Sequence, residues 1–314
     1  MVVRKFNYYR FFVFIVILLG IIFFTCRVIS KHNYKKTYDY KLSEIGYNER
    51  ETEILKNNLS NNELDKLLTK KYNKEIVGFV KEKYFIYKNL DDYLDYKNSH
   101  KSDSYNDIVS IVNTEANKEW IDNQKETDIS KGSLMLVNRI YGLKEDYEPD
   151  DIITVPAQYA YSGVKISNSI LESIINMIDA AKKEGYTFVL SDGYRSYKTQ
   201  SDIYDTYKRS YGERAADNEV ARPGHSEYQT GISFTIVPYN KAYDESKDSE
   251  EYTWLQNNAH KYGFIFRFTA DKTKLTGFGA FTWRLRYVGT EAASVMYQEK
   301  ICFEEYYAYY IDKE

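Results

Sequence analysis

Three polar blocks in the second half of the chain hold the residues best suited to chemistry. The blocks are SDGYRSYKTQ (191–200), ARPGHSEYQTGISFTIV (221–237) and FTWRLRYVG (281–289). Arginine presents a planar fork of donors that suits a carboxylate or a carbonyl. Arg195 and Arg284, if they converge, therefore predict a site for an anion.

Metal ligands are scarce in these blocks. A catalytic zinc site uses about three His, Cys, Asp or Glu ligands and an open position for water. A site built from His225, Glu227 and Asp217 is conceivable, and we leave it open. The other histidines are His32, His100 and His260, which are no better placed.

Taken in order, the blocks closely resemble the zinc D-alanyl-D-alanine carboxypeptidases of the VanY type, which remove the terminal D-alanine from peptidoglycan stem peptides. GYRS or PGHS alone would be a weak motif, but the order of all three blocks adds to the likeness. So do the flanks 134–152, 254–268 and 276–278. The resemblance spans about residues 130–300. It implies an α+β fold, with a carboxypeptidase-like domain whose central, mainly antiparallel sheet is flanked by helices.

The chain departs from the family pattern at four positions. The family has SEHQTG, an aspartate seven residues after that histidine, and later Glu-Pro-Trp-His; here those positions are Tyr228, Thr235, Phe281 and Arg284. None is a good zinc ligand, and Phe281 cannot accept a proton from water as the family's glutamate does. Arg284 places a fixed positive charge where a cation would sit. The resemblance thus predicts a degenerate site without zinc and without a catalytic residue.

Other residues of the family's pocket are still present. Arg195, Ser226, Tyr194 and Gln200 match positions in or around the substrate site, and with Arg284 they form the predicted ligand-binding set. The expected ligand is a stem-peptide carboxylate or another cell-wall anion. Two alternatives stay open: these side chains only brace turns, or Arg284 pairs with an acid such as Glu227.

The sequence therefore predicts a cell-envelope pseudopeptidase that binds stem peptides, or a cell-wall enzyme as partner, without hydrolysis. One alternative is an active zinc D,D-carboxypeptidase or endopeptidase with a non-standard site. Another is a structural domain whose pocket is closed by Tyr228 and Phe281. Net charge is −3, with acidic and basic residues interspersed, which argues against a nucleic-acid partner.

Periodicity predicts the elements that carry the blocks. We expect helices over 170–184, 197–214 and 250–262 and a strand over 186–191. Strict alternation in 232–237 and 282–288 puts apolar side chains on one face of each strand. Thr235 and Arg284 should then point together to the opposite face.

The N-terminal half predicts a membrane anchor and a spacer. Residues 11–26 carry no charge and extend through 29, so we expect a cytoplasmic segment over 1–10 and an uncleaved single-pass helix over 11–29. Lipidation of Cys26 is an alternative to plain insertion, and Cys302 fits a small buried apolar side chain. A mostly helical module is expected over 30–130, with a strand-like stretch at 76–80, followed by an extracytoplasmic domain over 131–314.

Overall fold

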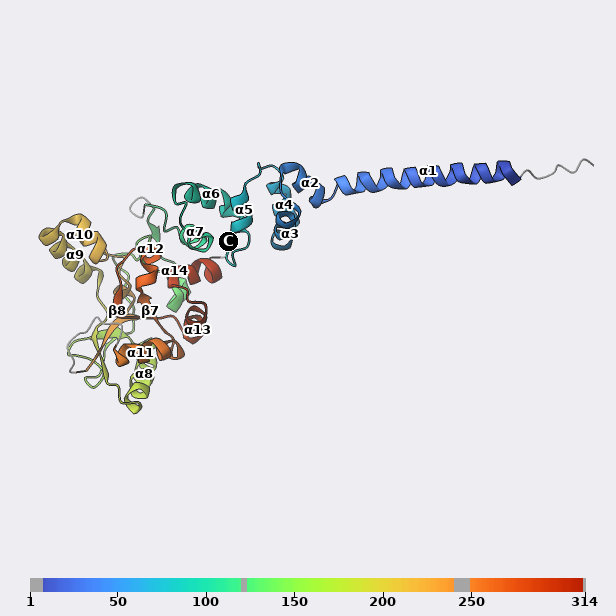
Figure 1. Cartoon of the computed structure of the whole chain (residues 1–314). Helices are drawn as coiled ribbons and strands as arrows, with labels where there is room; N and C mark the ends of the chain where they lie inside the picture. Colours follow the sequence, from blue (N-terminus) through green and yellow to red (C-terminus); the bar gives the residue numbers. More distant parts are fainter. Residues whose placement is uncertain (1–7, 120–122, 240–248, 313–314) are drawn as a thin grey trace, which may run out of the picture. The chain divides into compact units, whose positions relative to one another are not determined.

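The computed structural model describes residues 8–119, 123–239 and 249–312. By its internal contacts the chain divides into two compact units, residues 1–109 and 110–314. In the first unit every described element is helical (Figure 1). Its α-helices are α1 (Tyr8–Lys35), α2 (Tyr38–Ile45), α3 (Glu49–Asn58), α4 (Asn61–Leu67), α5 (Lys74–Phe79), α6 (Leu90–Ser99) and α7 (Tyr105–Asn113), which runs across the boundary.

Helix α1 contains a segment, Phe11–Lys35, that is long and apolar enough to cross a membrane. Its side chains are almost all exposed, as expected of a helix whose apolar surface has no protein partner. The helices that follow share a small core that includes Leu42, Leu55 and Leu64.

The strand expected at 76–80 is wrong, because residues 76–79 belong to α5, Val80 is its C-cap, and the first unit has no described strand to pair with them. The Asn73 side chain caps α5 by accepting a hydrogen bond from the Glu75 backbone N–H at 2.9 Å. Ile76, Val77 and Phe79 are buried in the unit.

The second unit is built around a four-stranded antiparallel sheet with the order β5-β6-β8-β7. Its strands are β1 (Lys125–Glu126), β2 (Tyr141–Gly142), β3 (Ile152–Thr154), β4 (Lys165–Ser167), β5 (Phe188–Asp192), β6 (Ser233–Pro238), β7 (Phe264–Phe268) and β8 (Phe281–Tyr287). Its α-helices are α8 (Leu171–Lys183), α9 (Tyr197–Tyr211), α10 (Glu213–Glu219), α11 (Glu250–Asn258), α12 (Thr273–Thr276), α13 (Thr290–Glu299) and α14 (Phe303–Tyr306), the last followed by a π-helical turn (Tyr307–Ile311). The α+β prediction is confirmed.

The two faces of the sheet differ as the alternation predicts. Phe234 of β6 and Leu285 of β8 are cross-strand partners and share the main core with α8 and α11 (Figure 1). Their neighbours Thr235 and Arg284 are also cross-strand partners and lie outside that core. The candidate functional site is built on this second face.

Two predicted helices are shorter than expected. The helix predicted over 197–214 is interrupted at Gly212, whose φ of 86° is in the left-handed region, so α9 and α10 are separate. Residues 259–262 form a 3₁₀ turn, η5 (Ala259–Tyr262), instead of extending α11. The other predicted helix and strand are present as α8 and β5.

Candidate functional site

The short 3₁₀ turn η4 (Glu227–Thr230) sets the position of Tyr228. It ends at Gly231, whose φ is 71° and whose hypothetical Cβ would lie 2.7 Å from the Ile152 side chain, so only glycine fits there without strain. The Thr230 hydroxyl donates to the Glu227 carbonyl at 2.6 Å. Tyr228 is consequently held in a buried position, with 3% of its surface exposed.

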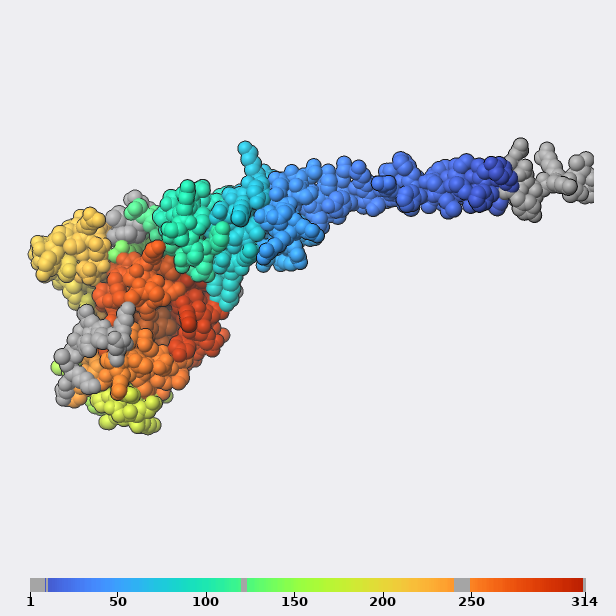
Figure 2. Space-filling model, viewed as in Figure 1, coloured from blue at the N-terminus to red at the C-terminus, as the bar shows by residue number. Residues whose placement is uncertain are grey.

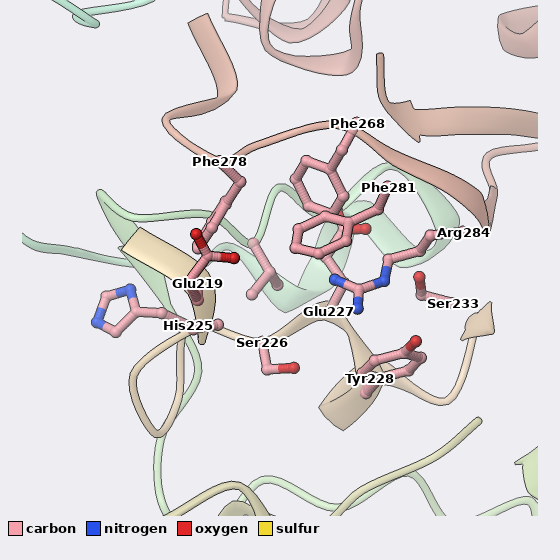
Figure 3. A pocket seen from close by; sticks show the side chains of 12 residues that line it. Glu219, His225, Ser226, Glu227, Tyr228, Ser233, Phe268, Phe278, Phe281 and Arg284 are labelled. Atoms are coloured by element: carbon pink, nitrogen blue, oxygen red, sulfur yellow. The ribbon is translucent and has the colours of Figure 1, made fainter. Parts of the chain in front are cut away.

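The structure brings Tyr228, Thr235, Phe281 and Arg284 together. Figure 3 shows three of these side chains, Tyr228, Phe281 and Arg284, at the cavity. The Tyr228 and Thr235 hydroxyl oxygens are 2.5 Å apart and share a hydrogen bond. The Arg284 guanidinium carbon lies 4.7 Å from the Tyr228 ring centroid and 4.5 Å from that of Phe281. At these distances both rings attract the cation.

Arg284 differs from the arginines around it because no ion pair holds it within the described residues. Its Nε is buried and lacks a hydrogen-bond partner there. The alternative in which Arg284 pairs with Glu227 is wrong, because Glu227 Oε1 accepts instead from Arg267 Nε at 2.7 Å and lies 3.3 Å from Arg286. A buried donor on a charged group without an acceptor favours binding of an anion.

Arg195 does not join Arg284 as a second free cation. Its guanidinium forms an ion pair with Asp192 and donates to the Gln200 Oε1 at 3.3 Å. Its carbon lies 4.4 Å from the Tyr228 ring centroid, so both arginines contact the same ring. The expectation of two uncompensated guanidiniums is therefore wrong for Arg195: the sequence analysis overlooked Asp192, three residues away at the end of β5.

The remaining predicted residues differ in their access to the site. Ser226 lines the same small cavity as Tyr228 and Arg284. Gln200 is buried and braced, since its Nε2 donates to the Ala221 carbonyl at 2.8 Å. Tyr194 is not among the cavity-lining residues; burial and the Glu148 carboxylate raise the pKa of its phenol.

A buried charge network lies behind the site, and the sequence analysis missed it. Arg267 has 0% of its side chain exposed and contacts Glu227 at 2.7 Å and Glu304 at 2.5 Å. Burial disfavours its charge, but the two carboxylates outweigh this effect and raise the pKa of Arg267. An arginine inside the apolar stretch FIFRF (264–268) was the available signal.

The cavity between these side chains is small. Its volume is about 20 Å³, which is room for roughly one water molecule. Its lining includes Ser226, Tyr228, Phe268, Phe278, Phe281 and Arg284, together with the acidic residues Glu219 and Glu227 (Figure 3). A terminal amino-acid residue of a peptide enters only if these rings move.

The donor set does not fit a zinc ion. Over residues 8–119, 123–239 and 249–312, no group of three or more His, Cys, Asp or Glu side chains is arranged to hold a metal. The site left open on His225, Glu227 and Asp217 is not assembled, since each contacts other protein groups. His225 Nδ1 is 2.8 Å from the Asn138 carbonyl, and Asp217 is paired with Arg222 at 2.8 Å. Burial lowers the pKa of His225.

Comparison with known proteins identifies the family to which this chain is similar. The family model for D-alanyl-D-alanine carboxypeptidase, VanY, matches residues 163–290, which include all three blocks. The Bacillus subtilis (strain 168) protein YodJ, which carries a provisional carboxypeptidase name, is 34% identical over 220 residues, covering 67% of this chain and 80% of YodJ.

Two solved structures extend the comparison. The LdcB LD-carboxypeptidase is 35% identical, with a TM-score of 0.56 over 61% of this chain and 92% of that one. The D,D-pentapeptidase VanY of the VanB-type cassette, solved as a mutant in complex with Zn(II), is 33% identical, with a TM-score of 0.48 over 55% and 98%. The chain belongs to the VanY D-alanyl-D-alanine carboxypeptidase family.

Proposed function

We propose that this chain is a membrane-anchored, cell-envelope member of the family that binds peptidoglycan stem peptides, or a wall-enzyme partner, without hydrolysing them. The observation that carries the proposal is the position of Arg284. Its guanidinium lies against Tyr228 and Phe281, at the positions where the family pattern has ligands and base, with no ion pair among the described residues. The proposal accordingly includes no zinc cofactor.

This arrangement is unfavourable for the two groups that peptide hydrolysis in the family pattern needs, a bound metal ion and a general base. A metal would have to bind beside a guanidinium that stays charged at every relevant pH. Phe281 has no group that could take a proton from an attacking water. The Glu227 carboxylate beside the site is held by Arg267 and Arg286.

Binding of a carboxylate is favoured because Arg284 has a buried donor without an acceptor. A peptide C-terminal carboxylate is the right partner for a buried guanidinium whose Nε has no acceptor among the described residues. The Ser226 hydroxyl lines the same cavity and offers a further hydrogen bond. Entry requires that Phe281, which is only partly buried, swing outward.

The second candidate is a structural domain with a permanently closed pocket. The volume of about 20 Å³ and the ring contacts of Phe268 with Phe278 and Phe281, at centroid distances of 5.4 and 5.7 Å, favour it. The two candidates differ in whether the rings yield to a ligand. Phe281→Ala should improve peptide binding if the ring gates a functional site.

Anchoring is proposed from the length and composition of α1. Its 28 residues extend over about 42 Å at 1.5 Å per residue, more than the roughly 30 Å of a bilayer core. If the helix stays uncleaved, the second unit is held on the outer side of the cell membrane, where the wall lies. Retention of the N-terminus in carbonate-washed membranes would support this; an N-terminus beginning after residue 26 in secreted protein would exclude it.

The test uses the full chain in detergent with a synthetic pentapeptide ending in D-Ala-D-Ala. We expect no D-alanine release above blank with added zinc, and pentapeptide binding by calorimetry that weakens at least tenfold in Arg284→Gln. Amidation of the peptide C-terminus should have the same effect. Arg209→Gln, on the exposed side of α9, is the matched control and should leave affinity within about twofold.

Each other outcome selects a different function. One tightly held zinc per chain together with D-alanine release would establish an active enzyme. Absence of binding in the wild type and in Phe281→Ala would favour the closed structural domain. Binding that is indifferent to Arg284→Gln would remove the anion site from the proposal.

A further inference from the structure

A second, much larger cavity lies at the free edge of the sheet. Strand β7 is the last in the order and pairs only with β8 within the described residues. Phe264, Ile265 and Phe266 all line the cavity, whose volume is about 540 Å³. Successive side chains of a strand point to opposite faces. A cavity that touches three consecutive residues therefore borders the edge of the strand itself.

Two helical layers form the walls of this slot. Gln256 and His260, from α11 and η5, line one side, and Met296 and Tyr297, from α13, line the other. Figure 2 shows a hollow between the orange segment that contains α11 and the red segment that contains α13. The His260 and Tyr297 rings stack with centroids 3.7 Å apart, so the walls meet there.

The lining combines an apolar floor with unused polar groups. Phe264, Ile265 and Met296 have at most 9% of their surface exposed and form the floor. The His260 Nδ1 is buried without a hydrogen-bond partner among the described residues. Lys300 lines the slot, is exposed, and has no ion pair there, whereas Lys272 is held by Glu305 at 2.7 Å. The slot also has one exposed acidic lining residue, Asp271, so Lys300 is the group that selects an acidic side chain.

We propose that this slot binds an extended peptide segment of a partner protein, which adds to β7 as a fifth strand. An edge strand presents unpaired N–H and C=O groups at about 3.4 Å per residue, the pattern that another extended chain complements. One apolar side chain of the peptide fills the floor beside Met296, and an acidic side chain pairs with Lys300. The volume lies within the range of about 300–1,000 Å³ found for ligand sites.

The site is separate from the one on the other strands. No residue lines both the slot and the small cavity around Arg284. The inference consequently does not rest on stem-peptide binding and survives if that function fails. A compact small molecule would contact the apolar floor but would not form hydrogen bonds along a five-residue strand edge. Hydrogen bonding to the backbone of β7 therefore distinguishes an extended peptide from a small molecule.

The experiment measures fluorescence anisotropy with the full chain in detergent. The probes are fluorescein-labelled heptapeptides of alternating threonine and apolar residues with two C-terminal glutamates, the central residue being Leu, Phe or Tyr. A parallel set carries N-methyl groups on alternate amides, which keeps the side chains and removes backbone donors. Gln256→Trp fills the slot, and Asn257→Trp, an exposed neighbour that does not line it, is the matched control.

We expect at least one peptide to bind, with affinity lowered at least tenfold by N-methylation and by Gln256→Trp and changed less than twofold by Asn257→Trp. Lys300→Ala should weaken binding of the glutamate peptides more than that of glutamine analogues. Amide exchange should slow in Phe264–Phe268 on binding. No binding of any peptide up to 1 mM, or equal binding of the N-methylated set, would overturn strand addition.

Discussion

Arg267→Met is the substitution that tests the buried network most directly. The arginine side chain is 0% exposed and contacts two carboxylates that are themselves only 4% and 2% exposed. Removing one partner of a buried ion pair costs about 3–5 kcal/mol, because the other charge stays buried and unpaired. Glu227 keeps Arg286 at 3.3 Å, so we expect the lower end, about 3 kcal/mol.

The measurement is thermal and urea unfolding followed by tryptophan fluorescence. Trp254 and Trp283 are buried in the second unit, so their signal reports the unit that contains Arg267. A loss of about 3 kcal/mol should lower Tm by roughly 6–12 °C for a unit of this size. The double variant Arg267→Met with Glu304→Leu should recover part of the loss, since it leaves fewer unpaired charges.

The matched control is Lys198→Met, which removes an ion pair with Asp202 whose side chains are 79% and 62% exposed. Exposed pairs of this kind contribute less than about 1 kcal/mol. A loss below about 1 kcal/mol for Arg267→Met, or a loss as large for Lys198→Met, would show that the buried network does not hold this face of the sheet together.

Two further predictions concern the site. The first restores the family pattern with four substitutions together: Tyr228→His, Thr235→Asp, Phe281→Glu and Arg284→His. We expect the full chain of this variant to retain about one zinc after dialysis, measured by elemental analysis, and the triple variant that keeps Arg284 to retain none. Equal zinc in the two variants would contradict the role given to the charge of Arg284. Burial lowers the pKa of His225 below its ordinary 6.5, so the unfolded chain binds more protons just below pH 6.5 and stability should fall as pH drops through that window. His225→Gln should flatten this part of the stability curve, and an unchanged slope would assign it to another group.

Local patterns predicted the strands that carry the site. Alternation in β6 and β8 placed Thr235 and Arg284 on one face, and they are indeed cross-strand partners. That prediction needed only the two-residue period of a strand. It could not give the contact partners of each charge, because these come from segments far apart in the sequence: Arg267 and Glu304, for example, are 37 residues apart.

The wrong predictions concern short segments, whose secondary structure and side-chain contacts depend on the rest of the fold. Residues 76–80 have a β-branched and aromatic composition, yet Asn73 caps a helix there and the first unit has no described strand to receive them. The closing of the site was also only an alternative in the sequence analysis. Phe268 and Phe278 come from separate segments, and nothing local indicates that their rings meet or that Phe268 lies beside Arg284.

The electrostatics of the site are consistent with a domain that folds without a metal. A metal site emptied of its ion leaves carboxylates that repel one another, whereas here two acids beside the site have cationic partners: Asp192 with Arg195, and Glu227 with Arg267 and Arg286. A third acid, Glu219, lines the cavity. Arg284 lies at the centre of the site and has no acid partner among the described residues. It packs instead against aromatic rings that attract its charge. Arg284 therefore supplies a positive charge at this centre, as zinc would, but one fixed in a side chain. Such a guanidinium can attract a carboxylate, which is the basis of the proposed binding function.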